Sequence, residues 1–470
     1  MTFKKFFNSN FFIFWIDLII RELFNGEKGV ETVIVIDFQL KKIKTKEAVI
    51  GVIGLGYVGF PLAVQVAKSG YHAIGFDLED EKIKIINQKR SELFGIRKSI
   101  ITGLVSKGFL VATNDYSFLA NIDIVCICVP TPLDKYQQPD TSYIKNSTEN
   151  IAKYLHKGML IILESTTYPG TTEELLKPIL EKKSGLKCGI DFYLAFSPER
   201  IDPGNQKYNV KNTPKIVGGI DENSTKLALL FYKNILECDV FTVSSPRVAE
   251  MEKIYENIFR NVNIALVNEM AILCHKMNID IWEVIEAAKT KPYGFMPFYP
   301  GPGIGGHCIP LDPFYLTWKA REYHYHTKFI ELAGEINQYM PEYVVERVAK
   351  ILSSKFKKSL NGAKILLLGV AYKKDISDLR ESPALEIITK LEKEQAILSY
   401  YDPYISEFTH NGKEYISLKK ITKEKIINKD IIIITTAHSK VDYKMVVKNA
   451  RAIFDTQNVI KINKENVEKL

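Results

Sequence analysis

A cysteine set among glycines is the residue of this chain best suited to chemistry. Cys308 lies in the stretch from Lys289 to Phe314, which reads KTKPYGFMPFYPGPGIGGHCIPLDPF. The prolines and glycines of this stretch disfavour regular helix or strand, so we expect a long ordered loop. Gly305 and Gly306 lack a Cβ, so a ligand could approach the sulfur closely. Cys308 is therefore a candidate nucleophile; the alternative is a connector that carries an incidental thiol.

A second group of candidates lies between Arg247 and Met277, in a segment that we predict to be one long helix. Lys253, Asn257 and Arg260 recur there at helical spacing and so share one face. A lysine beside an amide can stabilise a developing oxyanion. The alternative is a charged, solvated face. Apolar residues flank Lys253 and Asn257 on both sides, which favours a helix buried over much of its circumference and a homodimer or higher homo-oligomer.

The turn after the apolar run from Ala48 carries glycines spaced as GLGYVG. A strand, this turn, a helix through Ala67 and a second strand ending at Asp77 form the pattern of a dinucleotide-binding unit. The helix amino terminus can hold a pyrophosphate, and Asp77 can accept hydrogen bonds from a ribose hydroxyl. Because this carboxylate would repel a 2′-phosphate, we predict NAD as the cofactor. The turn residues expected to contact it are Gly54, Gly56, Tyr57, Val58 and Gly59.

Three further apolar runs of the first domain end in polar residues: IDIVCICVP before Thr131, MLIILEST at Thr166 and FYLAFSPE at Glu199. In a parallel sheet, ligands bind beyond the carboxyl ends of the strands, so we expect these three residues to face the cofactor. Glu199 could also reach a reacting centre; the alternative is a surface carboxylate in a turn. Cys126 and Cys128 lie inside the first run, and we expect both to be buried.

The carboxyl-terminal part alternates strands and helices again from about Ala363, which predicts a second parallel-sheet domain. It lacks GxGxxG, so it need not bind a dinucleotide, and Lys373, Lys374 and Arg380 after its first strand could meet phosphates. The sequence thus predicts an α/β protein with two Rossmann-like, doubly wound parallel-sheet domains joined by a long central helix. We divide it into an extension, residues 1–45, a first domain, 46–245, a central helical region, 246–340, and a second domain, 341–470.

The composition is that of an ordinary globular protein with a modest positive charge, since 46% of the 470 residues are hydrophobic, 25% are charged and the net charge is +8. This charge suits anionic ligands such as nucleotides, although a lysine-rich surface explains it equally well. The sequence has no arginine-rich tract, so we expect no nucleic-acid partner. Six cysteines without metal-ligand spacing predict a reducing, cytoplasmic location and no metal site.

The first 45 residues do not fit the alternating pattern. The apolar run from Phe11 to Ile20 is interrupted by Asp17 and is shorter than the about 20 residues that a membrane-spanning helix needs, so we expect no membrane span. Three interpretations stay open: a weak interfacial anchor, an extra packed element, or a start site placed too early. We favour the third, with the chain beginning nearer Lys41.

Several motifs together resemble those of the UDP-glucose/GDP-mannose dehydrogenase family. They are GLGYVG, SPER, AEMEKIYENIFRNVNIALVNE, GPGIGGHCIPLDPFYL and GVAYKKDISDLRESPALEI, and they extend from about Ala48 to the carboxyl terminus. Within the family, GPGIGGHCIPLDPFYL and FSPERIDPGN are most similar to bacterial UDP-N-acetylglucosamine 6-dehydrogenases. Arg260 stands where members that act on N-acetylated sugars carry an arginine.

This resemblance implies the four-electron oxidation of a sugar C6 alcohol to a carboxylate, with two NAD reduced. It implies that Cys308 attacks the intermediate aldehyde and carries a thiohemiacetal and then a thioester. Lys253 and Asn257 match the residues that stabilise the oxyanion and order the water, Glu199 matches the general acid/base, and Asp312 matches the aspartate that assists thioester hydrolysis. The residues then expected at the UDP-sugar are Arg260, Tyr299 with the stretch from Tyr293, Gly305 and Lys373, and Arg380 is expected to touch the cofactor.

Two departures from the family pattern bear on the substrate. Asn261 stands where many members acting on N-acetylated sugars have aspartate, and Pro203 replaces a glutamate of the UDP-glucose enzymes. We therefore predict UDP-N-acetyl-D-glucosamine, oxidised for surface polysaccharide biosynthesis, with UDP-N-acetylgalactosamine, UDP-N-acetylmannosamine and UDP-glucose as alternatives. A single-step dehydrogenase of the β-hydroxyacid type would not need Cys308 and would release one NADH per turnover, and an NAD sensor would release none.

Overall fold

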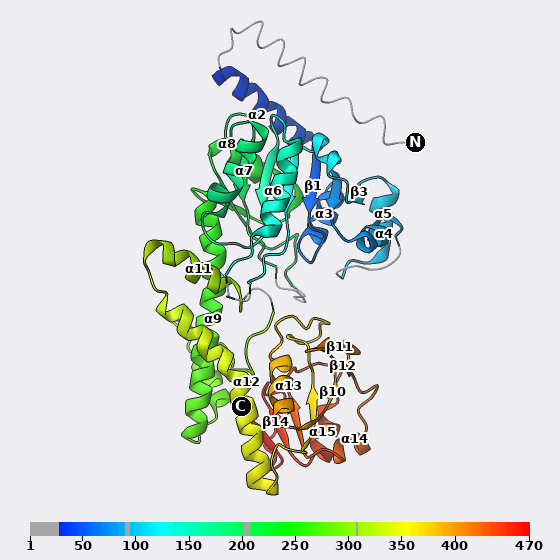
Figure 1. The fold of residues 1–470 in the computed structure, drawn as a ribbon, viewed down its shortest axis with the longest axis vertical. Helices are drawn as coiled ribbons and strands as arrows, with labels where there is room; N and C mark the ends of the chain where they lie inside the picture. Colours follow the sequence, from blue (N-terminus) through cyan, green and yellow to red (C-terminus); the bar gives the residue numbers. More distant parts are fainter. Residues whose placement is uncertain (1–27, 90–94, 135, 137, 202–206, 307–308) are drawn as a thin grey trace. The chain divides into compact units, whose positions relative to one another are not determined.

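A computed structural model of the chain describes residues 28–89, 95–134, 136, 138–201, 207–306 and 309–470. The chain divides into two units, Met1–Ile254 and Tyr255–Leu470, and the division falls inside the 31-residue helix α9, Pro246–Lys276 (Figure 1). The long helix predicted from Arg247 to Met277 is therefore confirmed within one residue at each end. Among the described residues, no helix is long and apolar enough to cross a membrane.

The first unit is built on one eight-stranded sheet in the order β3-β2-β1-β4-β5-β6-β7-β8. Its first six strands pair in parallel and follow the order 3-2-1-4-5-6, which is the order of dinucleotide-binding folds. Strand β7 runs antiparallel to β6 and parallel to β8. The strands are β1 (Val49–Ile53), β2 (His72–Phe76), β3 (Leu110–Thr113), β4 (Ile124–Ile127), β5 (Leu160–Leu163), β6 (Tyr193–Phe196), β7 (Lys215–Gly219) and β8 (Val240–Thr242).

Helices cover both faces of this sheet, which is why its strands are apolar on both sides. Alternate residues of β4 show the arrangement: Cys126 packs with the helices α3 and α8 on one face, and Val125 packs with α6 and α7 on the other. Cys126 and Cys128 are buried, as predicted. The helical segments are α2 (Lys28–Thr45), α3 (Gly59–Lys68), α4 (Asp80–Asn87), α5 (Lys98–Ser106), η2 (Tyr116–Asn121), α6 (Ser142–Tyr154), η3 (Thr172–Leu176), α7 (Lys177–Ser184) and α8 (Glu222–Ile235).

Helix α2 lies within the first 45 residues, which do not fit the alternating pattern of strands and helices. Ile36 and Ile43 join the core beside α8, and the Lys42 ammonium binds the buried Asp123 carboxylate at 2.7 Å. The Tyr71 hydroxyl donates to the Ile43 carbonyl at 2.7 Å. Of the three interpretations, the extra packed element describes residues 28–45, and this helix shares the core of the domain that we expected to begin at residue 46. The apolar run from Phe11 to Ile20 lies outside the described residues.

The second unit holds a five-stranded parallel sheet in the order β10-β9-β13-β14-β15 and a hairpin of β11 and β12. The sheet reverses direction of growth between β9 and β13, and such a switch point is where α/β sheets bind ligands. Two Rossmann-like domains joined by a long central helix are thus confirmed. The strands are β9 (Lys364–Leu368), β10 (Ile397–Tyr401), β11 (Glu407–His410), β12 (Lys413–Ile416), β13 (Ile431–Ile434), β14 (Ile453–Asp455) and β15 (Val467–Lys469).

The irregular stretch between α10 and α11 matches the predicted loop except at its end. It has no helix or strand among its described residues until Asp312, where α11 begins with Pro313 in the first turn, a position that proline favours. Helix α12 continues through Pro341, so the boundary predicted at 340–341 falls inside a helix whose second half packs in the core of the second sheet domain. The helical segments are α10 (Ile281–Ala288), α11 (Asp312–Ala320), η4 (Arg321–Tyr323), α12 (Lys328–Phe356), α13 (Pro383–Lys393), α14 (Lys423–Ile427) and α15 (Tyr443–Asn449).

Candidate active site

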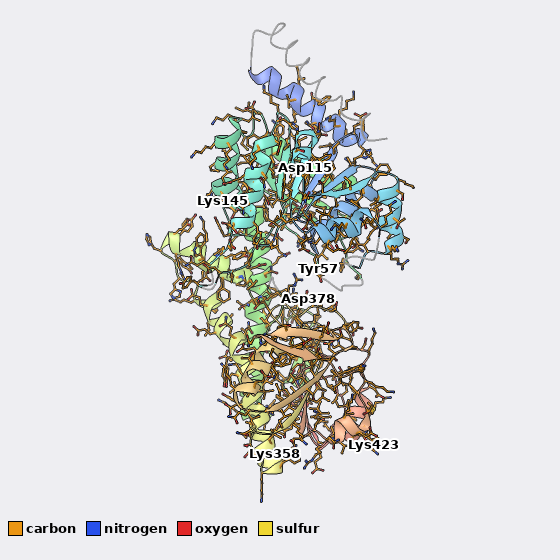
Figure 2. The ribbon with its side chains drawn as sticks, turned by 45° about the vertical axis from the view of Figure 1, so that its right-hand side comes forward. Tyr57, Asp115, Lys145, Lys358, Asp378 and Lys423 are labelled. Carbon is orange, nitrogen blue, oxygen red and sulfur yellow. The ribbon has the colours of Figure 1, made fainter. Side chains whose placement is uncertain are left out.

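The glycine turn between β1 and α3 has one open position and two closed ones. A Cβ on Gly54 would lie 2.5 Å from the Cys128 carbonyl oxygen, and one on Gly59 would lie 1.9 Å from the Gly54 carbonyl oxygen. A Cβ on Gly56 would meet nothing within 4 Å. Gly54 and Gly59 therefore let the turn close and the helix pack, and Gly56 leaves the space that a pyrophosphate needs. Between Gly56 and Gly59, Tyr57 is exposed and Val58 precedes the first residue of α3 (Figure 2).

Asp77 follows β2 and is fixed by the same turn. Its Oδ2 accepts hydrogen bonds from the Leu55 N–H at 2.8 Å and from the Lys82 ammonium at 2.9 Å, and its Oδ1 accepts from the Glu79 N–H at 3.0 Å. Burial alone would raise the pKa of Asp77, but the Glu79 N–H, the Lys82 ammonium and the Leu55 N–H lower it overall. A charged carboxylate thus stands beside the open glycine, as the binding of an adenosine ribose requires.

The ends of β4 and β5 meet through the two predicted threonines. The Thr131 hydroxyl donates to the Thr166 carbonyl at 2.7 Å, and Ser165 donates to the Val129 carbonyl at 2.8 Å. These bonds join the loops that follow two adjacent strands at the edge where the glycine turn also lies. The first unit therefore brings together the cofactor residues predicted within it.

Glu199 lies three residues after β6 and is held by its own backbone and by a buried lysine. Its Oε1 accepts from the Arg200 and Ile201 N–H groups at 2.8 Å each, and its Oε2 accepts from the Lys215 ammonium at 3.3 Å. Its side chain is 13% exposed, so it is no surface carboxylate. The neighbouring residues 202–206, including Pro203, lie outside the described residues.

Helix α9 carries Lys253 and Asn257 one turn apart, and both are buried. The Asn257 amide donates to the Asp312 carboxylate at 2.5 Å, and Asp312 is also buried. The carboxylate of Glu250, three residues before Lys253 on α9, accepts from the Gly170 and Thr172 N–H groups. The predicted amide and aspartate thus form one pair at the start of α11. Cys308 lies outside the described residues.

Arg260 and Tyr299, both predicted at the sugar, are exposed. Arg260 follows Asn257 on α9 but does not share its burial. The Tyr299 ring stacks on Trp282 with centroids 6.1 Å apart, and its hydroxyl donates to Glu286 at 2.8 Å. Their role at a substrate stays a prediction.

Three asparagines bind the loop that contains Cys308 on either side of the cysteine, at Gly301 and at Ile309. The sequence did not indicate this role. The buried Asn268 accepts from the Gly301 N–H at 3.0 Å and donates to Asn337, which in turn donates to the Asn261 carbonyl at 3.1 Å. The Asn261 amide donates to the Ile309 carbonyl at 3.2 Å. An aspartate at 261 would lack this donor. The departure at Asn261 is thus part of the loop's anchoring.

The two glycines before Cys308 are needed for packing. A Cβ on Gly305 would lie 2.6 Å from the Tyr372 Cβ, and one on Gly306 would lie 2.9 Å from the Tyr372 ring. The Gly306 N–H also donates to the Arg380 carbonyl at 3.0 Å. The sequence suggested that these glycines clear an approach to sulfur; in the structure they let the loop lie against the turn after β9.

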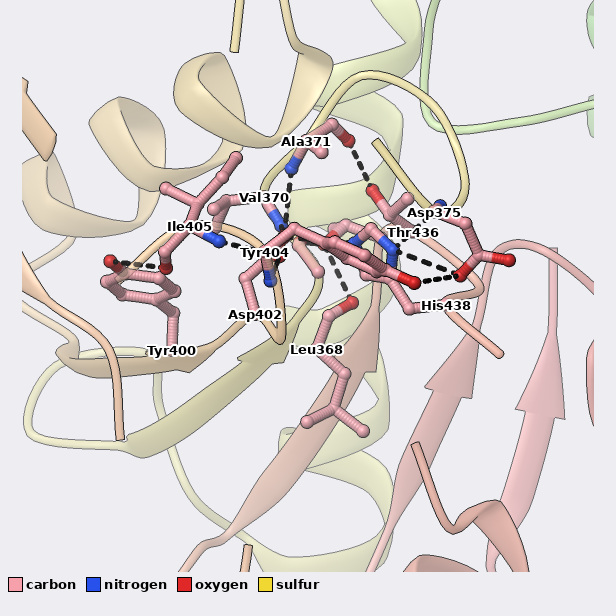
Figure 3. A network of polar contacts seen from close by, with 12 residues as sticks. Leu368, Val370, Ala371, Asp375, Tyr400, Asp402, Tyr404, Ile405, Thr436 and His438 are labelled. Atoms are coloured by element: carbon pink, nitrogen blue, oxygen red, sulfur yellow. Dashed lines mark hydrogen bonds and ion pairs between the residues drawn. The ribbon is translucent and has the colours of Figure 1, made fainter. Parts of the chain in front are cut away.

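That turn carries the phosphate-binding candidates of the second unit. Lys373 is half-buried in it, and the Arg380 guanidinium makes paired hydrogen bonds to Asp378 at 3.0 and 2.6 Å. Asp402 holds the start of the turn by accepting from the Val370 and Ala371 N–H groups (Figure 3). Arg380, predicted at the cofactor, thus belongs to a different unit from the other predicted cofactor residues.

His438 completes this network and was not singled out from the sequence. The Asp375 N–H donates to His438 Nδ1 at 3.0 Å, so the ring proton is on Nε2 and is donated to Asp402 Oδ2 at 3.0 Å (Figure 3). The ring is fully buried. The only signal was that both residues follow predicted strands, DP after β10 and AH after β13.

A known protein family matches all three parts of the chain through its three domains. The NAD binding domain of the UDP-glucose/GDP-mannose dehydrogenase family matches residues 48–236, its central domain matches residues 247–339, and its UDP binding domain matches residues 366–462. The glycine turn lies in the first match, Asn257 and Asp312 in the second, and Lys373 and His438 in the third.

Individual relatives cover most of the chain. The UDP-N-acetyl-D-glucosamine 6-dehydrogenase of Pseudomonas aeruginosa is 37% identical over 77% of this chain and 84% of the relative. The UDP-N-acetyl-D-mannosamine dehydrogenase of Pyrococcus horikoshii is 36% identical over 88% of this chain and 96% of the relative. A solved structure of a UDP-D-ManNAc dehydrogenase from Pyrococcus horikoshii has a TM-score of 0.81 at 33% identity and covers 90% of this chain and 98% of that chain.

Proposed function

Because this chain belongs to the UDP-glucose/GDP-mannose dehydrogenase family, we propose that it oxidises the C6 hydroxyl of a UDP-N-acetylhexosamine to a carboxylate. The observation that carries the proposal is the buried bond from Asn257 to Asp312, four residues after Cys308. A single oxidation to an aldehyde needs neither a thiol nor a carboxylate to hydrolyse a thioester. The open Gly56 and the charged Asp77 fit NAD.

The two oxidations are linked by a covalent bond to the chain. When bound, NAD accepts a hydride from C6 in each step. Glu199 takes the proton from the C6 hydroxyl, and the Cys308 thiolate adds to the aldehyde to give a thiohemiacetal. Glu199 returns its proton to the thiohemiacetal oxygen and takes it back as the second hydride leaves, which gives a thioester. Water then attacks the thioester and releases the carboxylate and the free thiol.

The residues of α9 and of α11 have different roles in the hydrolysis of the thioester. The Lys253 ammonium and the Asn257 amide stabilise the negative charge that develops on the sugar oxygen. The Asp312 carboxylate takes a proton from the attacking water. Because the Asn257 amide donates to Asp312, each fixes the other's orientation before substrate enters. Lys373 and Arg260 contact the UDP-sugar, and Arg380 contacts the cofactor.

UDP-N-acetyl-D-glucosamine is the best candidate substrate. Arg260 and the FSPER and GPGIGGHC motifs favour an N-acetylated sugar, and the Pseudomonas aeruginosa relative supports the gluco epimer. The Pyrococcus horikoshii relative supports UDP-N-acetyl-D-mannosamine at nearly the same identity. The uronate product suits surface polysaccharide biosynthesis, and we propose the cytoplasm as the location.

A panel of UDP-hexoses and UDP-N-acetylhexosamines, assayed by NADH release and by mass of the product, tests this function. We expect two NADH per molecule of UDP-N-acetyl-D-glucosamine consumed and a uronate as product. Cys308→Ser should form no carboxylate and still bind NAD and sugar nucleotide. A ratio of one NADH per sugar would indicate the single-step dehydrogenase, and NAD binding without turnover on any UDP-sugar would indicate a sensor.

We also propose that the enzyme is a homodimer or a larger homo-oligomer. Four exposed large apolar side chains of α9, together with Met277 directly after the helix, are spaced by four or seven residues, which places them on one stripe. Soluble monomers rarely expose such a continuous apolar stripe, and a second copy of the same chain would bury it. The stripe consists of Tyr255, Phe259, Leu266, Leu273 and Met277.

A further inference from the structure

We propose that Lys215, anchored by Glu164, is the positioning residue that fixes the orientation and the charge of the Glu199 carboxylate. The inference rests on the proposed function, because Glu199 acts there as the acid/base group. The new element is the buried pair of Lys215 and Glu164. The antiparallel pairing of β6 and β7 brings Lys215 to this place.

The direction of β7 brings Lys215 to the edge of the sheet at which β5 and β6 end. Strands β6 and β7 pair antiparallel with Phe196 opposite Gly218. Glu199 lies three residues beyond Phe196, and Lys215 lies three residues before Gly218, so the same register continued outward sets them opposite each other. In a parallel strand, the first residue would lie at the far edge. The reversal of β7 therefore delivers a lysine to the ligand edge, where β5 and β6 end.

Glu164 holds the lysine in this place. It follows β5, and its Oε2 accepts from the Lys215 ammonium at 2.7 Å while its Oε1 accepts from the Tyr232 hydroxyl at 2.7 Å. The Lys215 side chain is 8% exposed and that of Glu164 is fully buried. Both oxygens of Glu164 are thus engaged, and the ammonium has its longer contact, 3.3 Å, with Glu199 Oε2. Since Glu199 Oε1 is bound by two N–H groups, Oε2 is the oxygen that can exchange a proton.

The ionisable groups around the contact between Glu199 and Lys215 are not all charged. Burial would lower the pKa of Lys215, but the charges of Glu164 and Glu199 raise it overall, so the lysine is cationic. Burial raises the pKa of Tyr232 on α8 and of Cys126 and Cys128 at β4, so these groups are neutral. The adjacent Arg200 is directed elsewhere, because its guanidinium donates to the Pro214 carbonyl and lies 3.6 Å from Glu252 of α9.

Three charges therefore share this site: one ammonium and two carboxylates. Removing the lysine leaves Glu199 near a second carboxylate, which favours its protonated form. Neutralising Glu164 removes the carboxylate that competes for the Lys215 ammonium. The positive charge then acts on Glu199 alone and favours its ionised form. The two changes act on Glu199 with opposite sign, and a lysine that served only the packing of the core would not produce this pattern.

The pH dependence of kcat/KM for NADH release tests the inference. We expect the acidic limb to move to higher pH by about one unit in Lys215→Met and to lower pH in Glu164→Gln, because a charge at this distance shifts a carboxylate pKa by about one unit or more. Lys215→Arg should restore the position of the limb. Limbs that do not move, or that move in the same direction in both variants, would overturn the proposal.

Two further measurements cover the remaining outcomes. If Lys215→Met does not fold, the double variant Lys215→Met with Glu164→Gln removes both buried charges and should still raise the limb, since Glu199 loses its cation. The ionisation of Glu199 can also be followed without turnover, by isotope-edited infrared titration of the full chain against Glu199→Gln. The pKa of Glu199 should shift in the same two directions there. An unshifted infrared pKa overturns the positioning role, whereas absence of turnover in the unmodified chain overturns only the proposed function.

Discussion

The amide of Asn257 donates to the carboxylate of Asp312 at 2.5 Å, across 55 residues of chain, and both residues are buried. Asn257 comes from the middle of α9 and Asp312 is the first residue of α11. The bond joins the helix that carries the oxyanion candidates to the segment that follows Cys308. The amide thereby fixes the orientation of the carboxylate that we propose to act on water.

Asp312→Asn should lower kcat by about 100-fold or more, because the general base is lost while the shape of the side chain is kept. Affinities for NAD and for the UDP-sugar should stay within about twofold, since the substitution changes no residue proposed to bind them. Stopped-flow release of NADH separates the steps: the first hydride transfer should persist and the covalent intermediate should accumulate. Glu322→Gln is the control, because Glu322 pairs with Lys319 at the other end of α11. A fully active Asp312→Asn variant would exclude the hydrolytic role.

Gly56 and Gly59, two of the three glycines of the turn, should respond differently to alanine. Gly59→Ala places a Cβ 1.9 Å from a backbone oxygen and should destabilise the fold by about 3 kcal/mol or more. Gly56→Ala meets nothing within 4 Å and should fold normally, yet it should weaken NAD binding about tenfold or more by blocking the pyrophosphate. Denaturant unfolding and titration with NAD check the pair. Equal NAD affinity in Gly56→Ala and the unmodified chain would contradict the placement of the cofactor.

The parts of the fold that follow from local pattern were predictable. The glycine turn, Asp77 and the strand ends at Thr131 and Thr166 are set by short-range rules, because a strand, a turn and a helix in that order fix where each side chain lies. The burial of Lys253 and Asn257 followed from the apolar residues around them. A helix face can be read from spacing alone.

The residues that were missed depend on contacts distant in sequence. Lys215 contacts Glu199 because β7 runs antiparallel to β6. The segment TPKIVGG does not indicate the direction in which this strand runs. Helix α2 was set apart because its attachment is a buried pair, Lys42 with Asp123, 81 residues away. The packing of Gly305 and Gly306 against Tyr372 was likewise not predicted, since Tyr372 is more than 60 residues away in the sequence. Contacts of this kind depend on residues distant in the sequence, so they produce no periodic pattern in the local sequence.

The Asp402 network should make the stability of the chain depend on pH. Burial alone would raise the pKa of Asp402, but His438 and the Val370 and Tyr404 N–H groups lower it overall. Because the folded pKa lies below the unfolded value of about 3.9, the stabilisation is fully present above that pH and is lost as the pH falls through the lowered folded pKa.

Asp402→Asn should therefore cost about 1–3 kcal/mol at neutral pH, where hydrogen bonds to a charged group are lost. The difference from the unmodified chain should shrink below about pH 4. Urea unfolding between pH 3 and pH 7 measures both. Asp442→Asn is a matched control, since Asp442 caps α15 at the surface by accepting from the Met445 N–H. A cost that stays constant down to pH 3 would show that the charge of Asp402 contributes nothing.

Charges placed on the α9 stripe should separate the proposed homodimer. Leu266 and Leu273 are 53% and 45% exposed, and in a twofold interface each lysine introduced there would be buried close to its symmetry mate. The double variant Leu266→Lys with Leu273→Lys should sediment as a monomer at concentrations where the unmodified chain sediments as a dimer or larger. Ile416→Lys is the control, because Ile416 is 69% exposed on β12, away from α9, and should leave the assembly intact. If both variants keep the assembly of the unmodified chain, the oligomer forms through another surface.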